Sequence, residues 1–157
     1  MIVDEILDAV VDAVTGVTVT TDSGAPSQFS HLQAFESLAR STSGDRVFMV
    51  SLNRADPDGW RDGTGTVGVG AFYVTVDVAV RYVNEGRTSW AFEQILAQDR
   101  RKIIDGVCQY VREQANVAGV GECLYIGGTI TDSERSRAVV SSFSFRVEYQ
   151  DTITRVA

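Results

Sequence analysis

The chain has 157 residues, 44% of them hydrophobic and 22% charged, which is the size and balance of one globular domain, residues 1–157. Its formal net charge of −7 argues against a dedicated nucleic-acid-binding role, because affinity for phosphates comes from clustered Lys and Arg. No stretch approaches the ~20 apolar residues that a membrane-spanning helix needs, and the acidic start of the chain predicts no export signal. We therefore expect a protein that stays inside the cell, or inside something assembled there.

The N-terminal part of the chain predicts a helix followed by an extended arm. In residues 1–14, apolar side chains recur at helical spacing, and acids occupy the other face and the first turns, where the helix dipole favours negative charge. Residues 16–43 are the predicted arm. Within it, 17–21 are β-branched and favour a strand, 22–27 (DSGAPS) favour a loop, and the apolar spacing in 32–39 favours a short helix.

The middle of the chain predicts two strands separated by a long loop. Residues 46–53 are nearly all apolar, as in a strand that is buried on both faces. Residues 71–83 alternate, with apolar side chains on one face and Asp77 and Arg81 among those on the other. This period of two is typical of an antiparallel strand packed on one side only. Between them, residues 54–70 predict a long, glycine-rich hairpin loop.

The C-terminal half predicts a long helix and a second hairpin. Residues 90–114 carry an apolar stripe at helical spacing, and a polar run around Asp99 interrupts it, so we expect a kink or a restart there. Two further strands, 122–131 and 137–150, close the chain. The order hairpin, helix, hairpin predicts an α+β fold: an antiparallel sheet of about four main strands with amphipathic helices packed on one face.

The residues that most often carry catalysis are scarce. His31 is the only histidine, so a Ser-His-Asp or Cys-His arrangement would have to use it, and no nucleophile motif lies beside it. Cys108 and Cys123 are the only cysteines, with no metal-ligand spacing around either, and we expect them to be small buried hydrophobic residues rather than a disulfide. The sequence therefore predicts no enzyme, no catalytic residue, no metal and no cofactor.

Three interpretations compete for the loop 54–70. Asp56, Asp58 and Asp62 hint at a calcium loop, but valine stands where an EF-hand needs a bidentate Glu. The glycines lack the G-K-[ST] ending of a P-loop and run into a strand, not a helix, so a phosphate cradle is excluded. What remains is a charged loop around Trp60 with the composition of a binding hot spot, against the alternative of an insertion without function.

Three features of the order of elements match one family. An acidic N-terminal helix precedes the strand DRVFMVSL (45–52), a long hairpin precedes the helix that contains DRR (99–101), and the chain closes on the strand FSFRVEY (143–149). In these features the chain resembles the tail terminator proteins of long-tailed bacteriophages. The similarity covers most of the chain as an order of elements.

The resemblance implies a homohexameric ring in the virion, assembled in the host cytoplasm, without catalysis or an obligatory cofactor. Its partners would be the tail-tube protein on one side and a neck or head-completion protein on the other, with no membrane involved. DNA would pass through the channel without specific binding. An acidic protein suits this role, because like charges repel and DNA must pass without being held.

Under this resemblance, the loop 54–70 becomes a projecting arm that grips another protein. Charges on the polar faces of two strands become candidate contacts between subunits, with a solvated sheet face as the alternative. The candidate interface residues are Asp56, Asp58, Trp60, Arg61, Asp62, Asp77, Arg81, Arg146 and Glu148.

Two other functions stay open. Another phage neck or tail-tube subunit, such as a head-tail joining protein, would share the composition, the ring symmetry and the long loops, and a tube subunit would polymerise into filaments. A small cellular ligand-binding α+β domain would instead give Asp56, Asp58 and Asp62 a metal, which calcium-dependent stability would reveal.

Overall fold

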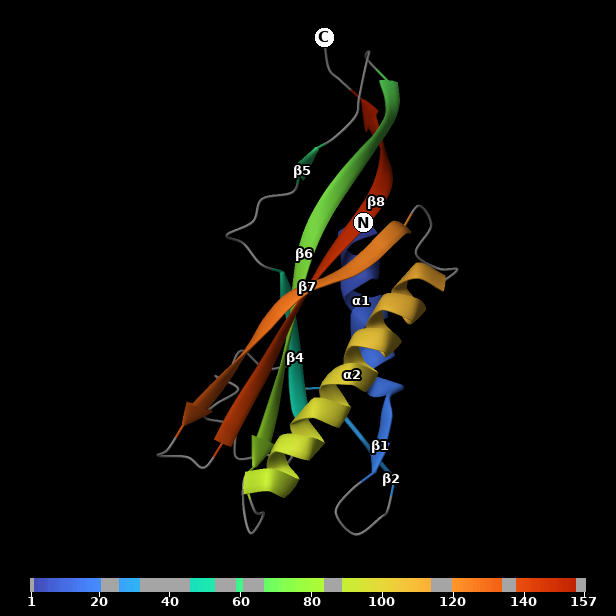
Figure 1. Ribbon diagram of the computed structural model, residues 1–157. Coiled ribbons are helices and arrows are strands. Elements are labelled where there is room, and N and C mark those ends of the chain that lie inside the picture. Colours follow the sequence, from blue (N-terminus) through green and yellow to red (C-terminus); the bar gives the residue numbers. More distant parts are fainter. Residues whose placement is uncertain are drawn as a thin grey trace.

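The computed structural model describes residues 2–20, 26–31, 46–52, 59–60, 67–83, 89–113, 120–133 and 138–154. Two helices, α1 (Ile2–Thr15) and α2 (Ser89–Glu113), pack side by side on one face of a mixed, mostly antiparallel sheet (Figure 1). This is the α+β fold predicted from the order of the elements. In the part of the chain that the structure describes, neither helix has the length and hydropathy that crossing a membrane requires.

The main sheet has the strand order β3-β4-β6-β8-β7, and β5 pairs with β6 beside this path. β3 pairs with β4 in parallel, whereas the other described pairs are antiparallel. A separate antiparallel ribbon joins β1 to β2. The strands are β1 (Thr18–Thr20), β2 (Pro26–Gln28), β3 (Ser30–His31), β4 (Val47–Leu52), β5 (Gly59–Trp60), β6 (Val67–Val83), β7 (Val120–Ser133) and β8 (Ala138–Thr154).

The predicted strands are present, and two of them are longer than the pattern indicated. β6 begins at Val67, so the last residues of the predicted loop 54–70 are strand, and β8 continues to Thr154, which pairs with Val67. Residues 68 and 70 are glycines, so this part of the strand shows no alternation of apolar and polar side chains. The hydrogen bonds between the strands still form, because they join backbone groups. Beyond the other strands, β6 and β8 run on together as a two-stranded ribbon (Figure 1).

The arm region agrees with the prediction in part. The predicted strand at 17–21 is β1, and the predicted loop 22–27 is wrong at its end, because Pro26 and Ser27 pair with β1 as part of β2. The short helix expected in 32–39 lies outside the described residues.

The core fills the space between the helices and the sheet. Register places the buried face of β6 directly opposite that of β8, for example Val76 against Phe145 and Val78 against Phe143. α1 adds Ile6, Val10 and Val14, and α2 adds Phe92, Leu96, Ile103, Val107 and Val111, all buried. Burying one such Val, Ile or Phe side chain contributes roughly 1.5–3 kcal/mol, so this layer is the main source of stability.

α2 runs unbroken through Asp99, so the predicted kink is wrong. Asp99 lies on the core side of the helix, three residues after Leu96 and four before Ile103. It is buried, and both of its carboxylate oxygens accept hydrogen bonds from Arg46, Oδ2 from Nε at 2.9 Å and Oδ1 from Nη2 at 3.4 Å. The hydroxyl of Tyr82 donates a further bond of 2.9 Å to Oδ2. Asp99 can therefore be part of the buried face of α2, because its charge is paired inside the core.

Arg46 reaches Asp99 from an unusual backbone conformation. Its φ of 56° lies in the left-handed region that non-glycine residues seldom adopt, at a cost on the order of 1 kcal/mol. In this conformation its carbonyl oxygen accepts a hydrogen bond from the Ser30 amide at 3.0 Å, just before β4 begins. One residue thus ties the start of β4 to both β3 and α2.

Candidate assembly surface

The loop residues proposed as a protein grip are only partly within the described chain. Gly59 and Trp60 form the short strand β5, and their backbones pair with Tyr73 and Phe72 of β6. The predicted loop is therefore attached to the sheet at Trp60. Asp56, Asp58, Arg61 and Asp62 lie outside the described residues.

The four charges proposed on the strand faces are brought to one face of the sheet, but only three of them reach its surface. Asp77 accepts a hydrogen bond of 2.7 Å from the Ser144 hydroxyl. The exposed Arg146 places its guanidinium carbon 4.3 Å from the centre of the Tyr73 ring, a cation–π contact, and Glu148 is paired across the strands with Tyr73. These residues give β6 and β8 a polar, interlocked outer face.

The prediction that β6 is packed on one side only fails at Arg81, which lies on the face expected to be exposed. Its side chain is 7% exposed, and Thr75 on the same face is buried as well. Register places Arg81 between Val47 of β4 and Val140 of β8, in the interior of the sheet and away from its edges. In this conformation Arg81 offers little surface to a neighbouring chain.

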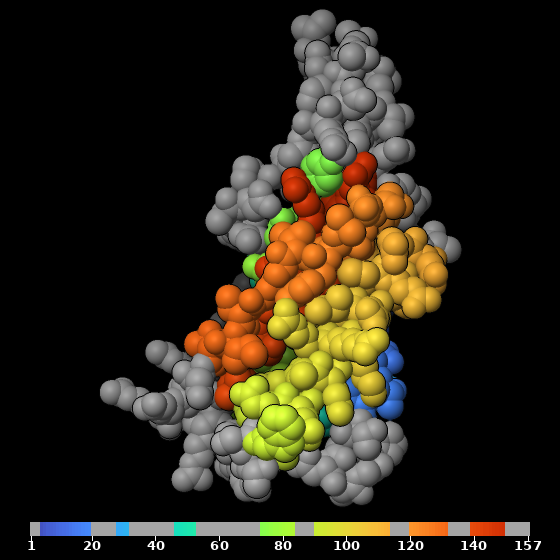
Figure 2. All heavy atoms as spheres, in the orientation of Figure 1, coloured from blue at the N-terminus to red at the C-terminus, as the bar shows by residue number. Residues whose placement is uncertain are grey.

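Sequence reasoning missed an apolar surface on the strand β7. It ends the strand order, so one of its edges has no partner strand among the described residues. Three large side chains on it stand out into solvent: Leu124 at 47%, Ile126 at 51% and Ile130 at 53% exposure. The signal was available in CLYIGGTIT (123–131), where apolar residues occur at both odd and even positions. Figure 2 shows β7 in orange on the surface beside α2 in yellow.

The β7 edge has few of the features that normally prevent strands from pairing between molecules. Edges are usually blunted by charges, by proline, by β-bulges or by very short strands. β7 has 14 residues, and from Cys123 to Thr131 it contains neither a charged residue nor a proline. Its register with β8 shifts between Tyr125 and Gly127, where Gly127 has a φ of 135°. This irregularity leaves Ile126 outside the ladder with β8.

A hollow of about 250 Å³ lies beside this edge, between β7, β8 and α2. Arg100 of α2 closes one side, where its Nη2 donates a 2.6 Å hydrogen bond to the Tyr125 hydroxyl. The rest of the lining is Gly128, Thr129, Ile130, Ser141, Ser142 and Phe143. Gly128 is required here, because a Cβ at this position would lie 2.2 Å from the Ser142 carbonyl oxygen. The hollow is a recess of mixed polarity that includes the exposed Ile130, a place where a side chain from another chain could pack.

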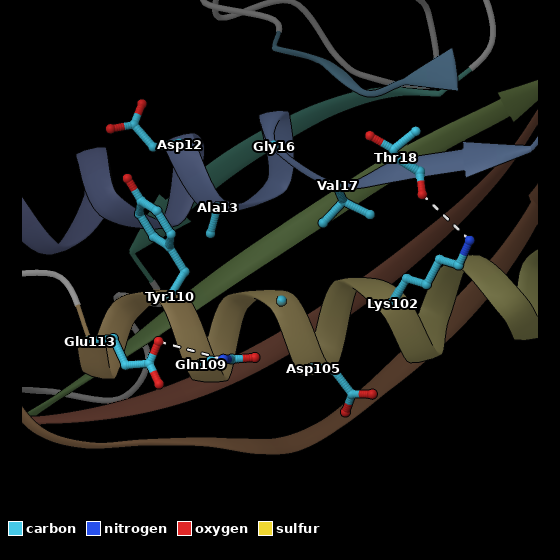
Figure 3. A pocket seen from close by; sticks show the side chains of 11 residues that line it. Asp12, Ala13, Gly16, Val17, Thr18, Lys102, Asp105, Gln109, Tyr110 and Glu113 are labelled. Atoms are coloured by element: carbon cyan, nitrogen blue, oxygen red, sulfur yellow. Dashed lines mark hydrogen bonds between the residues drawn. The ribbon is translucent and has the colours of Figure 1, made fainter. Parts of the chain in front are cut away.

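On the helical side, a groove of about 610 Å³ runs between the end of α1 and the second half of α2 (Figure 3). Its floor is built from small residues such as Ala13 and Gly106. Asp12, Asp105 and Glu113 contribute carboxylates, and Lys102 donates a 3.4 Å hydrogen bond to the Thr18 carbonyl oxygen. With the exposed acids Asp4, Glu5 and Asp8 on α1, this side of the molecule is strongly acidic.

Within the described ranges, no group of three or more His, Cys, Asp and Glu side chains could hold a metal ion. His31 lies on β3, with its ring centre 5.1 Å from that of Phe48, as a partly buried packing residue. The calcium interpretation of Asp56, Asp58 and Asp62 concerns residues outside the description.

No family model matches the chain, and a search of curated proteins found no match.

Proposed function

We propose that the chain is a structural virion protein, a tail terminator that caps the tail tube as a homohexameric ring and joins the tail to the head connector. The order of elements that carries the resemblance supports it. The observation that carries it furthest is the edge of β7, a 14-residue strand that is uncharged from Cys123 to Thr131 and carries three exposed aliphatic side chains. Such an edge is completed by another chain, through backbone hydrogen bonds and burial of Leu124, Ile126 and Ile130.

A closed ring needs two different surfaces on each subunit, because each subunit meets one neighbour with one face and the next neighbour with another. The fold offers such a pair. β7 ends the sheet on one side, whereas α1 lies over the other half of the sheet, in contact with β3 and β4. In the proposed ring, the β7 edge of one subunit packs against the far side of the next.

The distribution of charge supports the same role. The exposed face of α1 carries Asp4, Glu5, Asp8 and Asp12, and the whole chain has a net charge of −7. If this surface lines a channel for DNA, its negative charge repels the DNA phosphates, so the DNA passes through without being held. The polar outer sheet face with Asp77, Arg146 and Glu148 is a further surface for contacts with the tube or the neck.

The test is capping of tail tubes. Purified protein is added to isolated tail tubes and imaged by negative stain, and closed rings of uniform size on tube ends are the expected result. Filaments of the protein alone would indicate a tail-tube subunit instead. Failure to bind tubes in any form would overturn the proposal.

A calcium titration tests the remaining alternative. A ligand-binding domain that uses Asp56, Asp58 and Asp62 would gain thermal stability by mass action as calcium saturates it. The proposed structural role predicts an unchanged unfolding midpoint at saturating calcium. A midpoint that rises with calcium concentration would favour the ligand-binding alternative.

A further inference from the structure

The only two cysteines of the chain meet in one packed cluster between α2 and β7, although fifteen positions separate residue 108 from residue 123 in the sequence. Cys108 is on α2 and Cys123 is on β7, and both are free thiols. The two thiols are within hydrogen-bonding reach, and the sulfur of Cys108 also meets the backbone of Tyr125. Cys108 packs against the core cluster that contains Cys123, and this places both side chains in the layer between α2 and β7.

We propose that Cys108 and Cys123 are an oxidisable pair, which forms a disulfide between α2 and β7 when the protein meets an oxidising thiol environment. The two sulfurs must approach to about 2.05 Å to bond, and the packing of both side chains in one cluster brings them into the same part of the core. The chain holds no third cysteine that could compete. This inference goes beyond the proposed function and does not depend on it.

The exposure of the two thiols sets the order of the reaction. Cys108 is partly exposed, whereas Cys123 is buried. With oxidised glutathione as oxidant, the Cys108 thiolate attacks one glutathione sulfur, the glutathione S–S bond breaks, and one glutathione thiolate leaves. The Cys123 thiolate then attacks the Cys108 sulfur and releases the second glutathione thiolate. The two protein protons pass through solvent to the leaving thiolates, so one disulfide is reduced as one forms.

Burial makes this reaction slow near neutral pH. It raises the pKa of the Cys123 thiol to about 12, and it raises the pKa of the Cys108 thiol as well. Because the thiolate is the nucleophile, each step should accelerate as pH rises. The pair should therefore stay reduced in a reducing compartment and close gradually in an oxidising one.

The product would fasten the edge strand to the long helix. Cys123 pairs with Val147 of β8, just before the register shift at Tyr125–Gly127. A covalent link at this point holds both α2 and the irregular part of β7, and it restricts the unfolded chain. We expect the oxidised protein to unfold at a higher temperature than the reduced protein.

The test incubates the full chain with oxidised glutathione from about pH 7 to about pH 9, blocks remaining thiols by alkylation, and reads the intact mass and a non-reducing peptide map. The expected product is monomeric, has lost two hydrogens, and links the peptides of Cys108 and Cys123. Its formation should be faster at the higher pH, and its unfolding midpoint should be higher.

Two serine variants keep the result interpretable. Cys123→Ser should accumulate a glutathione adduct on Cys108, because the second step is blocked. Cys108→Ser should stay largely unmodified, because Cys123 is buried. A wild-type chain that stops at the glutathione adduct, remains fully reduced at about pH 9, or forms only intermolecular disulfides would overturn the proposal.

Discussion

The interior and the β7 edge of this molecule reverse the usual distribution of polar and apolar side chains. Inside, Asp99 and Arg46 form a buried ion pair, and Tyr82 supplies a third hydrogen bond. Outside, Ile126 and Ile130 expose more than half of their side chains. The difference is that the interior group is completed within the chain, whereas the edge finds no partner strand among the described residues. A buried charge with its partners is a matter of folding, and an exposed apolar edge is a matter of assembly.

The interior half of this comparison predicts the largest effect. Asp99→Ala leaves the guanidinium of Arg46 buried without its carboxylate, so we expect a loss of about 3–5 kcal/mol in the free energy of unfolding. Chemical denaturation monitored by circular dichroism measures it. Asp105→Asn, on the exposed side of the same helix, is the matched control and should change stability by less than about 0.5 kcal/mol.

A second variant separates charge pairing from packing. Replacing both partners together, Arg46→Met with Asp99→Leu, removes the unpaired charge and should cost clearly less than Asp99→Ala alone. If the double variant were as unstable as the single one, the buried charge would not be the cause.

For the β7 edge, the comparison predicts that a substitution weakens association between chains and changes the stability of the fold little. Ile126→Lys with Ile130→Lys places two charges on the β7 edge, which strand pairing between chains does not tolerate. We expect self-association to weaken by at least about 100-fold, equivalent to roughly 3 kcal/mol. Sedimentation over a concentration series measures it. Gln94→Lys, an exposed position on α2, adds a charge away from the edge and should leave association unchanged.

The loop attached at β5 predicts a change in docking but not in folding. Trp60→Ala should weaken binding to tail tubes by about 2 kcal/mol, the effect of a hot-spot residue. Co-sedimentation with tubes measures it. Trp90→Ala removes the same kind of side chain from the first turn of α2, where it is 74% exposed, and should leave tube binding unchanged. Equal losses for both tryptophans would contradict a specific role for the loop.

The smallest effect tests the outer end of β7. Glu122 stands directly opposite Glu148 of β8, and like charges in this position destabilise a sheet. Glu122→Lys should therefore raise the free energy of unfolding by roughly 0.2–1 kcal/mol, with Glu122→Gln giving a smaller gain. A loss of stability in the Lys variant would show that Glu122 is held by a favourable contact.

Periodicity predicted the elements because their side chains report their environment. The spacing of Ile6, Val10 and Val14 predicts α1, and the alternation from Val74 to Tyr82 predicts the buried face of β6. Where glycines replace side chains, at the start of β6, the pattern carries no signal although the ladder continues. At Asp99 the pattern gave the wrong answer, because a polar residue in an apolar stripe looks like a break until its partner, 53 positions away, is known.

The candidate site was less predictable than the fold, since it depends on which strand lies at the edge. Leu124 and Ile126 read as ordinary strand residues, and only the order β6-β8-β7 places them on an open edge. The contact between Cys108 and Cys123 likewise follows from the packing of α2 on β7, which no spacing in the sequence encodes. Arg81 was assigned to a surface from alternation alone, whereas the structure buries it between two neighbouring strands.

The most direct test of the central claim compares the mass of the wild-type chain and of the Ile126→Lys, Ile130→Lys variant by light scattering, alone and on tail tubes. The account predicts one closed oligomer for the wild type, in solution or on the tube ends, and a folded monomer for the variant that does not cap tubes. A variant that assembles as the wild type does, or a wild type that remains monomeric in both settings, would contradict the claim that the β7 edge is the assembly surface.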